Sequence, residues 1–455
     1  MSDQKPAAAD QGAEKPFTIM SADSHVGLPP EEYRPYLDPQ YRDAFDSYLE
    51  DNLVFQGMFR KLGYPWSPQV LDVIDKEGVY CSGGVAGFYD PHRRLRVMER
   101  DGLVAEILHP GGPMAITPWA DPGTRRVSEE LRAAGTAAYN RFLDDFCSAD
   151  RKRLIGVPST YPWPDMDAAA RTVKWAGKQG MVGVYPARFA GAPDDLPPIY
   201  DRSWDPFFKA CSDTGVAVHL HAGSGKPQGF MLTRIKTALE KAGQGPDALA
   251  QIFEGIFDER RPLWQMMWAG VFDRFPDLRV VFAEIRSHWV PPTLDALTRI
   301  NDEAGGVLKR TPWEYWERNC AVTPTFMRVS DLEVRHRVGL EKTMFGSDYP
   351  HAESTWPNTL DFLRVVLNDV PEPDARAILG DNAINFYGLD RVYLENLAQK
   401  YCPKPSELLG MAHAVDPQLI EHFNNRNGLN KKVSFEEEKF NEVVFKDTEA
   451  ALGMR

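Results

Sequence analysis

Short apolar runs alternate with amphipathic stretches from about residue 17 to residue 389. Eight runs rich in β-formers predict strands, at 17–25, 104–109, 154–159, 181–185, 216–225, 278–284, 319–323 and 343–348. Apolar positions at helical spacing predict helices, at 91–101, 125–149, 165–178, 204–214, 263–275, 290–302 and 326–339. Strands that alternate with helices usually pair in parallel. Eight such units predict an α/β fold, a (β/α)8 TIM barrel. A doubly wound nucleotide-binding sheet is disfavoured, because no Gly-x-Gly-x-x-Gly follows the first strand.

The same pattern divides the chain into three parts. Residues 1–15 are polar and rich in Ala without any period, which predicts a disordered leader. The barrel is expected to span 16–390, with insertions at 28–80 and 226–262. Residues 391–455 have a helical, charged pattern. We expect them to form a C-terminal extension over the barrel surface or against a neighbouring subunit.

The fifth predicted strand carries two histidines. His219 and His221 should point to one face, with Val218 and Leu220 on the other, because side chains alternate along a strand. Two imidazoles are costly to bury unpaired, and a metal is one way to satisfy them. This stretch alone equally permits two core histidines that are bonded to backbone.

Polar residues recur where the predicted strands end. They are Asp23, His25, His109, His219, His221, Glu284, His288, Asp348 and His351. In a barrel, these strand ends meet at one rim, where loops build the active site. Six of the ten histidines fall there. Mixed nitrogen and oxygen donors suit Zn²⁺, Mn²⁺ or Fe²⁺.

These residues could hold either one metal ion or two. One metal could take Asp23 or His25, together with His221 and Asp348. His109, His219, Glu284 and His288 then exceed one coordination sphere, which raises a second metal. Simpler roles also remain open: a loop cap for Asp23, a buried loop position for His109, and a backbone bond at a helix start for His288.

The net charge limits which partners are expected, and the cysteines indicate the cellular compartment. The formal net charge of −13 argues against nucleic acid or an anionic membrane surface as partner. No apolar run has the length of a membrane span, and the start has no apolar signal core. The five scattered cysteines form no Cys-x-x-Cys pair, so we expect reduced thiols in a cytoplasmic protein. A homo-oligomer, by default a dimer, is expected from the symmetry preference of enzymes.

Several of these motifs together resemble the amidohydrolase superfamily. They are Asp23-Ser-His25, His221, Ala283-Glu284 followed by Trp289-Val-Pro, and Gly346-Ser-Asp-Tyr-Pro-His351. More narrowly, residues 17–389 resemble the amidohydrolase-related branch that includes aminocarboxymuconate-semialdehyde decarboxylase. The resemblance implies a metal-dependent (β/α)8 barrel, His25 and His221 as metal ligands, and Asp348 as the metal-bound aspartate that handles protons.

The chain departs from this family at three places. The usual first motif is His-x-His, where this chain has Asp23-Ser-His25. The sixth strand of the decarboxylases ends in a histidine that acts as acid and base, where this chain has Glu284. The fourth strand, Gly183-Val-Tyr185, offers no lysine for a carbamate that bridges two metals.

Three functions follow as hypotheses. The first is a metal-dependent hydrolase or C–C lyase, decarboxylase-like, on a small carbonyl or carboxylate substrate. The metal would lower the pKa of a bound water, Asp348 would take its proton, and Glu284 or His288 would assist. Arg286 or Arg188, with Trp289 and His351, would contact the substrate. The second is a non-haem dinuclear iron or iron–manganese monooxygenase, and the third is an inactive barrel that serves as a subunit.

Overall fold

The computed structural model describes residues 14–50, 68–111, 117–119, 127–160, 165–186, 197–222, 260–325, 327–351, 353–432 and 440–445. The predicted leader to residue 13 and the predicted insertion between 226 and 259 lie outside these residues.

The strands are β1 (Met20–Val26), β2 (Ala105–Pro110), β3 (Leu154–Gly156), β4 (Ser159–Thr160), β5 (Gly183–Pro186), β6 (Ala217–His221), β7 (Val280–Ala283) and β8 (Cys320–Thr323). The helices are α2 (Pro68–Ile74), α3 (Pro91–Arg100), α4 (Glu129–Cys147), α5 (Met166–Lys178), α6 (Asp205–Thr214), α9 (Arg261–Trp268), α10 (Val271–Arg274), α11 (Val290–Glu303), α12 (Pro312–Asn319), α13 (Val329–Glu333), α14 (Arg335–Val338), α15 (Thr359–Val366), α16 (Glu372–Arg376), α17 (Asn382–Tyr387), α18 (Arg391–Tyr401), α19 (Pro405–Leu408) and α20 (Pro417–Asn427). Shorter helical turns lie at η1 (Pro30–Tyr36), η2 (Pro39–Tyr41), η3 (Gly84–Phe88), η4 (Arg202–Trp204), η5 (Leu340–Lys342), η6 (Ala377–Asp381) and η7 (Ala412–Ala414).

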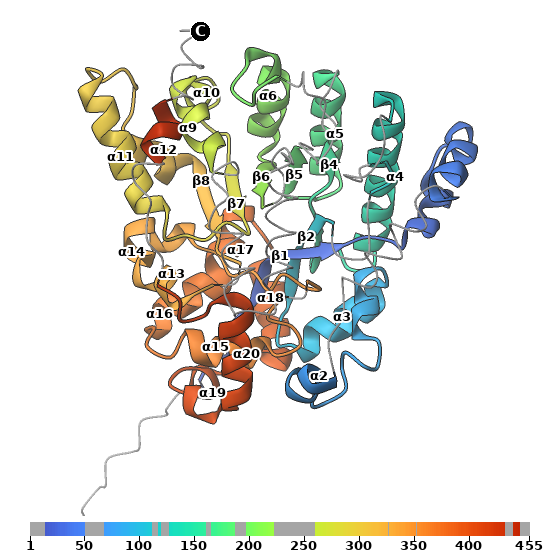
Figure 1. Cartoon of the computed structure of the whole chain (residues 1–455), viewed down its shortest axis with the longest axis vertical. Helices are drawn as coiled ribbons and strands as arrows, with labels where there is room; N and C mark the ends of the chain where they lie inside the picture. Colours follow the sequence, from blue (N-terminus) through green and yellow to red (C-terminus); the bar gives the residue numbers. More distant parts are fainter. Residues whose placement is uncertain are drawn as a thin grey trace, which may run out of the picture.

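All paired strands run parallel, in the orders β1-β2-β3 and β4-β5-β6-β7-β8. The predicted strand at 154–159 is divided into β3 and β4, because Pro158 has no N–H to donate. Its two halves still join the sheets: Val157 N donates to Leu108 O of β2, and Tyr185 N of β5 donates to Pro158 O. The expected barrel of parallel strands surrounded by helices is confirmed (Figure 1).

The predicted eighth strand, at 343–348, has only one bridge, between Val322 and Thr343. It nevertheless closes the ring, because Met344 N donates to Val322 O at 3.0 Å and Ala22 N of β1 donates to Phe345 O at 2.7 Å. The predicted helix at 263–275 is also divided, into α9 and α10, at Gly270, which has a φ of 65°.

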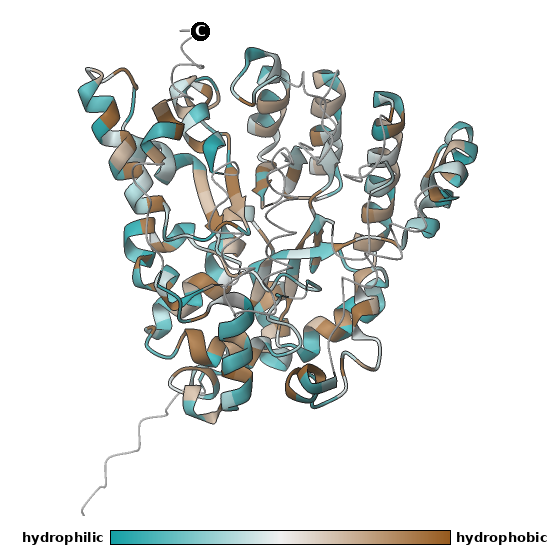
Figure 2. Cartoon of the chain, viewed as in Figure 1, coloured by the Kyte–Doolittle hydropathy of each residue, from teal (hydrophilic) through white to brown (hydrophobic). Residues whose placement is uncertain are grey.

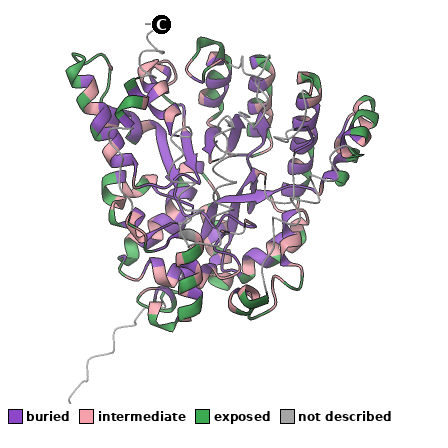
Figure 3. Cartoon of the chain, viewed as in Figure 1, coloured by how far each residue is buried: buried purple, intermediate pink, exposed green. Residues whose placement is uncertain are grey.

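Alternation along the strands decides what fills the barrel. On β7, Val280 and Phe282 pack outward with the helices, while Val281 and Ala283 pack inside. The strands are buried and the helices expose their outer sides (Figure 3), which are also the hydrophilic sides (Figure 2). No helix of the described residues combines the length and apolar character that crossing a membrane requires.

Candidate metal centre

Asp23 lies at the centre of a buried cluster inside the barrel. Its side chain is held by β1, and its Oδ1 lies 3.3 Å from Nδ1 of His109 and 3.2 Å from Nε2 of His221. Its Oδ2 accepts a hydrogen bond from Thr325 Oγ1. Strands β1, β2 and β6 therefore bring the first group of metal-competent donors together, Asp23, His109 and His221.

A second group contains His25, Asp348 and His351. Nε2 of His25 lies 3.1 Å from Oδ1 of Asp348, and the rings of His25 and His351 have centroids 4.5 Å apart. The backbone joins this group to the first, because Asp348 N donates to Asp23 O at 2.8 Å.

Glu284, Asp348 and Glu353 form a third group. Glu284 Oε2 lies 3.4 Å from Nδ1 of His221, so this group also adjoins the first. Glu284 and Asp348 have φ values of 56° and 62°, a left-handed conformation that is unfavourable for residues with a side chain. Strained backbone of this kind is concentrated at functional sites.

The buried donor atoms fit a metal ion. Within the described residues, five of them make no well-directed hydrogen bond, although some lie close to another donor: His25 Nε2, His109 Nδ1, His351 Nε2 and both carboxylate oxygens of Asp348. Burying such atoms without a partner is costly, and a cation coordinated by them removes that cost. The donors are imidazole and carboxylate, the set that divalent zinc, manganese and iron accept.

The pKa values of the buried carboxyl groups also favour a bound cation. Burial, reinforced by the charge of Glu284 and of Asp23, raises the pKa of Asp348 well above its usual value. Burial also raises the pKa of Glu284. Burial alone would raise the pKa of Asp23, but the charges and hydrogen bonds of His221 and His109 together outweigh burial, and the pKa is lowered. So many buried carboxylates ionise together only when a cation compensates them.

His219 lies one layer deeper in the barrel than the first group. Its Nδ1 is 2.8 Å from His109 Nε2, and its Nε2 is 3.2 Å from Tyr387 Oη of α17. Both ring nitrogens are therefore engaged, and His219 orients the ring of His109. Burial lowers the pKa of His219 well below its usual value, so the ring is neutral. Among the described residues, His219 joins none of the three groups, and its metal ligation stays a prediction.

His288 contacts a different carboxylate. Its Nδ1 lies 3.5 Å from Oδ1 of Asp331, which also accepts from Ser287 N, Ser287 Oγ and His288 N. Burial alone would raise the pKa of Asp331, but the hydrogen bond and charge of His288 hold it well below the usual range. Arg286, 2% exposed, lowers it further. The catalytic role of His288 stays a prediction.

The substrate contacts predicted for Trp289 and Arg188 stay predictions. Trp289 is fully buried, its Nε1 donates to Ile285 O, and its ring packs against Phe282 and Trp316 in the core. Arg188 lies outside the described residues.

The sequence reasoning missed Thr325, Glu353 and the ion pair beneath His25. Thr325 and Glu353 each lie two residues beyond a strand-end or rim position, Thr323 and His351, and this spacing was the available signal. Beneath the site, Arg94 pairs with Glu106 and donates to His25 O at 3.1 Å, which fixes the backbone that carries this imidazole. Arg94 and Glu106 are 12 residues apart on the consecutive elements α3 and β2, a separation that matches no helix or strand period, so the pair gives no local signal.

Comparison with known families gives one match, a family model described as Amidohydrolase, over residues 111–389. No curated protein sequence matches the chain. Among solved structures, an amidohydrolase from Mycobacterium avium subsp. paratuberculosis is similar at 21% identity and a TM-score of 0.56, covering 82% of this chain and 99% of that one. A 5-carboxyvanillate decarboxylase from Novosphingobium aromaticivorans, complexed with manganese and 4-hydroxy-3-methoxy-5-nitrobenzoic acid, is similar at 17% identity and a TM-score of 0.56. The match covers 84% of this chain and 98% of that one. A 2,6-dihydroxybenzoate decarboxylase from Rhizobium is similar at 16% identity and a TM-score of 0.53, and the match covers 82% of this chain and 99% of that one. These structures share the fold.

Proposed function

Since the chain belongs to the amidohydrolase family, we propose that it is a metal-dependent C–C lyase that removes CO₂ from a small aromatic carboxylate. The observation that carries the proposal is the cluster of buried imidazole and carboxylate donors inside the barrel, five atoms of which make no well-directed hydrogen bond. Two solved structures of the same fold are aromatic-acid decarboxylases, and one contains manganese, which supports this substrate class and this metal. The same site would also suit a hydrolase that acts on a small carbonyl substrate.

Asp23, His25, His221 and Asp348 would hold the metal, with His109 and His351 close enough to join them. A divalent cation there supplies a Lewis acid for a carboxylate, carbonyl or phenol oxygen of the substrate. Hydrogen bonds from other side chains hold these donors in position. Thr325 donates to Asp23, and Arg94 donates to the backbone carbonyl of His25.

Glu284 and Asp348 are the proton carriers in this proposal. Their carboxylates belong to one donor group, and Glu284 lies 3.4 Å from His221. When CO₂ leaves, the electron pair of the broken C–C bond stays on the ring carbon, which must then take one proton. A protonated carboxyl at Glu284 or Asp348 delivers that proton, and solvent returns it. The balance is one carboxylate and one proton in, one arene and one CO₂ out.

Release of CO₂ tests this proposal. Full-length protein is stripped with a chelator, reloaded with Mn²⁺ or Zn²⁺, and incubated with a panel of hydroxybenzoates. We expect CO₂ release that depends on metal and that Asp348→Asn lowers by about 10²- to 10⁴-fold. Asp295→Asn, on the exposed side of α11, is the matched control and should keep the wild-type rate. Absence of CO₂ from every acid with both metals would overturn the lyase, and ester hydrolysis measured in parallel identifies a hydrolase.

A dinuclear iron or iron–manganese monooxygenase is the second candidate. It is favoured by one observation, that the groups Asp23–His109–His221 and His25–Asp348–His351 share no residue. Two such groups offer more donors than one ion normally takes from protein in a catalytic site. Elemental analysis of protein purified without added metal separates the candidates. Two irons, or one iron and one manganese, per chain with O₂ consumption support the oxygenase, while one zinc or manganese supports the lyase.

A further inference from the structure

Three buried side chains form a hydrogen-bonded network that leads from the candidate metal centre into the barrel. His109 Nε2 lies 2.8 Å from His219 Nδ1, and His219 Nε2 lies 3.2 Å from Tyr387 Oη. The rings of His219 and Tyr387 are nearly parallel, with 22° between their planes and centroids 5.8 Å apart. His109 and His219 are fully buried, and Tyr387 is 7% exposed. Water therefore has little access to these hydrogen bonds.

The inner end of this network, Tyr387, is held in a fixed position. Tyr387 is the last residue of α17, and it belongs to the same core cluster as Ala217, the first residue of β6. The side chain of Arg279 donates to the carbonyl oxygens of Phe386 and Gly215. Arg279 therefore ties the end of α17 to the segment that leads into β6, the strand that carries His219.

The two hydrogen bonds of His219 must run in the same direction. Its ring is neutral, and a neutral imidazole has one N–H and one lone pair. In one direction, His219 donates to Tyr387 and accepts from Nε2–H of His109, whose Nδ1 then keeps its lone pair. In the other direction, Tyr387 donates to His219 and His219 donates to His109, so that Nδ1 of His109 carries the proton.

The surroundings of His109 favour the first direction. Its Nδ1 lies 3.3 Å from Asp23 Oδ1, but within the described residues this nitrogen makes no well-directed hydrogen bond. A buried N–H at that place would be poorly satisfied, which is costly. A lone pair there could instead bind a cation together with Asp23 and His221. A histidine that binds a metal through one ring nitrogen usually donates a hydrogen bond from the other, and Nε2 of His109 has an acceptor for it in His219.

We propose that Tyr387 and His219 are positioning residues, which hold His109 in the tautomer whose Nδ1 binds the metal ion. His109 Nε2–H donates to His219 Nδ1, and His219 Nε2–H donates to Tyr387 Oη. The proposal rests on the proposed function for the presence of the metal, and it does not depend on which reaction the metal serves. It gives a role in metal binding to α17, which contributes no donor to the three groups of the described residues.

Metal affinity tests the proposal. Chelator-treated, full-length protein is titrated with Zn²⁺ by calorimetry in the presence of a competing chelator. We expect Tyr387→Phe and His219→Leu each to weaken Zn²⁺ binding by about 10- to 100-fold, as the loss of a partner behind a metal ligand does. His219→Asn should recover part of the loss, because its side-chain oxygen can accept the hydrogen bond from His109 Nε2. Tyr315→Phe is the matched control: it removes a buried tyrosine's hydrogen bond to Asp273, on the outer helices, and should keep the wild-type affinity.

A purely structural role of the network gives a different pattern. Tyr387→Phe and Tyr315→Phe would then lower the urea midpoint of the metal-free protein by similar amounts and leave Zn²⁺ affinity unchanged. Wild-type affinity in both Tyr387→Phe and His219→Leu would overturn the proposal. A loss of affinity in Tyr315→Phe as large as that in Tyr387→Phe would also overturn it.

A crystal structure of the zinc-loaded wild type is a second test, which needs no variant. Nδ1 of His109 should lie about 2.1 Å from the ion. An ion in the barrel that leaves Nδ1 of His109 bonded to Asp23 would overturn this proposal and leave the proposed function intact. Zinc-loaded protein with His109 as a ligand that releases no CO₂ from any acid would keep the network and exclude the lyase. Wild-type protein that binds no metal would overturn both.

Discussion

Gly183, at the start of β5, leaves room for the ring of His219. A Cβ at this position would lie 2.5 Å from two atoms of that ring, closer than any real contact. Gly183→Ala should therefore displace His219 and destabilise the protein by roughly 1–3 kcal/mol, as overpacked cores do. Urea unfolding measures this. Gly177→Ala, in α5, is the matched control, because its nearest contact would be 3.4 Å away and alanine favours a helix.

At the scale of elements, Asp331 of α13 connects two segments around the site. It accepts hydrogen bonds from Ser287 N, His288 N and Arg328 N, and so joins the loop after β7 to the start of α13. Asp331→Ala leaves these donors buried without an acceptor, and should cost about 3 kcal/mol or more. Asp295→Ala removes an exposed pair with Arg337 and should cost about 1 kcal/mol at most in the same unfolding experiment. Equal costs would contradict the connecting role.

The junction of α3 and α15 predicts a pH dependence. Asp101, at the end of α3, accepts from Thr359 N and Thr359 Oγ1, and burial raises its pKa to about 7. The unfolded chain ionises Asp101 near pH 4, so the stability this group contributes is complete below about pH 4 and is lost as pH rises towards 7, by at most about 1.4 kcal/mol per unit.

Asp101→Asn removes this titration while it keeps an acceptor for Thr359. The melting temperature of the variant minus that of the wild type should therefore increase from about pH 5 to about pH 8. A constant difference over this range would show that the carboxyl titrates equally in the folded and unfolded chains.

For the whole molecule, metal binding should appear as stability. A cation that binds only the folded barrel adds about 2.7 kcal/mol to the free energy of unfolding when its concentration is 100 times its dissociation constant. Mn²⁺ should raise the melting temperature of chelator-treated protein, less so at lower pH because imidazole and carboxylate ligands must lose their protons. The increase should be absent in Asp348→Asn. An equal increase in that variant would locate the ion elsewhere.

The sequence alone determined the fold class and the positions of the rim residues. Alternation between apolar strands and amphipathic helices is a local property, and parallel strands place their carboxyl ends together wherever they occur. The β1, β2 and β6 donors were therefore foreseeable, and Asp23, His109 and His221 lie close together as a rim position requires. Their roles as ligands stay predictions until a metal is measured.

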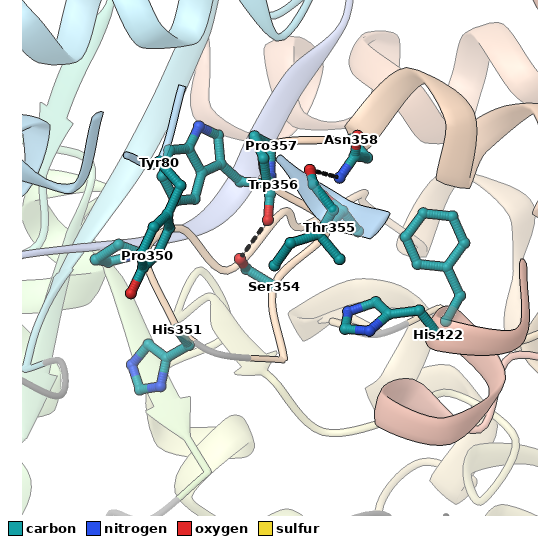
Figure 4. A pocket seen from close by; sticks show the side chains of 11 residues that line it. Tyr80, Pro350, His351, Ser354, Thr355, Trp356, Pro357, Asn358 and His422 are labelled. Atoms are coloured by element: carbon teal, nitrogen blue, oxygen red, sulfur yellow. Dashed lines mark hydrogen bonds between the residues drawn. The ribbon is translucent and has the colours of Figure 1, made fainter. Parts of the chain in front are cut away.

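Only the tertiary structure decided which rim residues meet. His288 follows β7 and Asp348 ends the strand on the other side of β8, and His288 contacts Asp331 while Asp348 contacts His25. These partners depend on how each loop leaves its strand and on which distant helix packs against it, and the spacing of residues does not encode either. For the same reason, the spacing of residues could not predict that His422 of α20 and His351 line one pocket (Figure 4), since they are 71 residues apart in the chain.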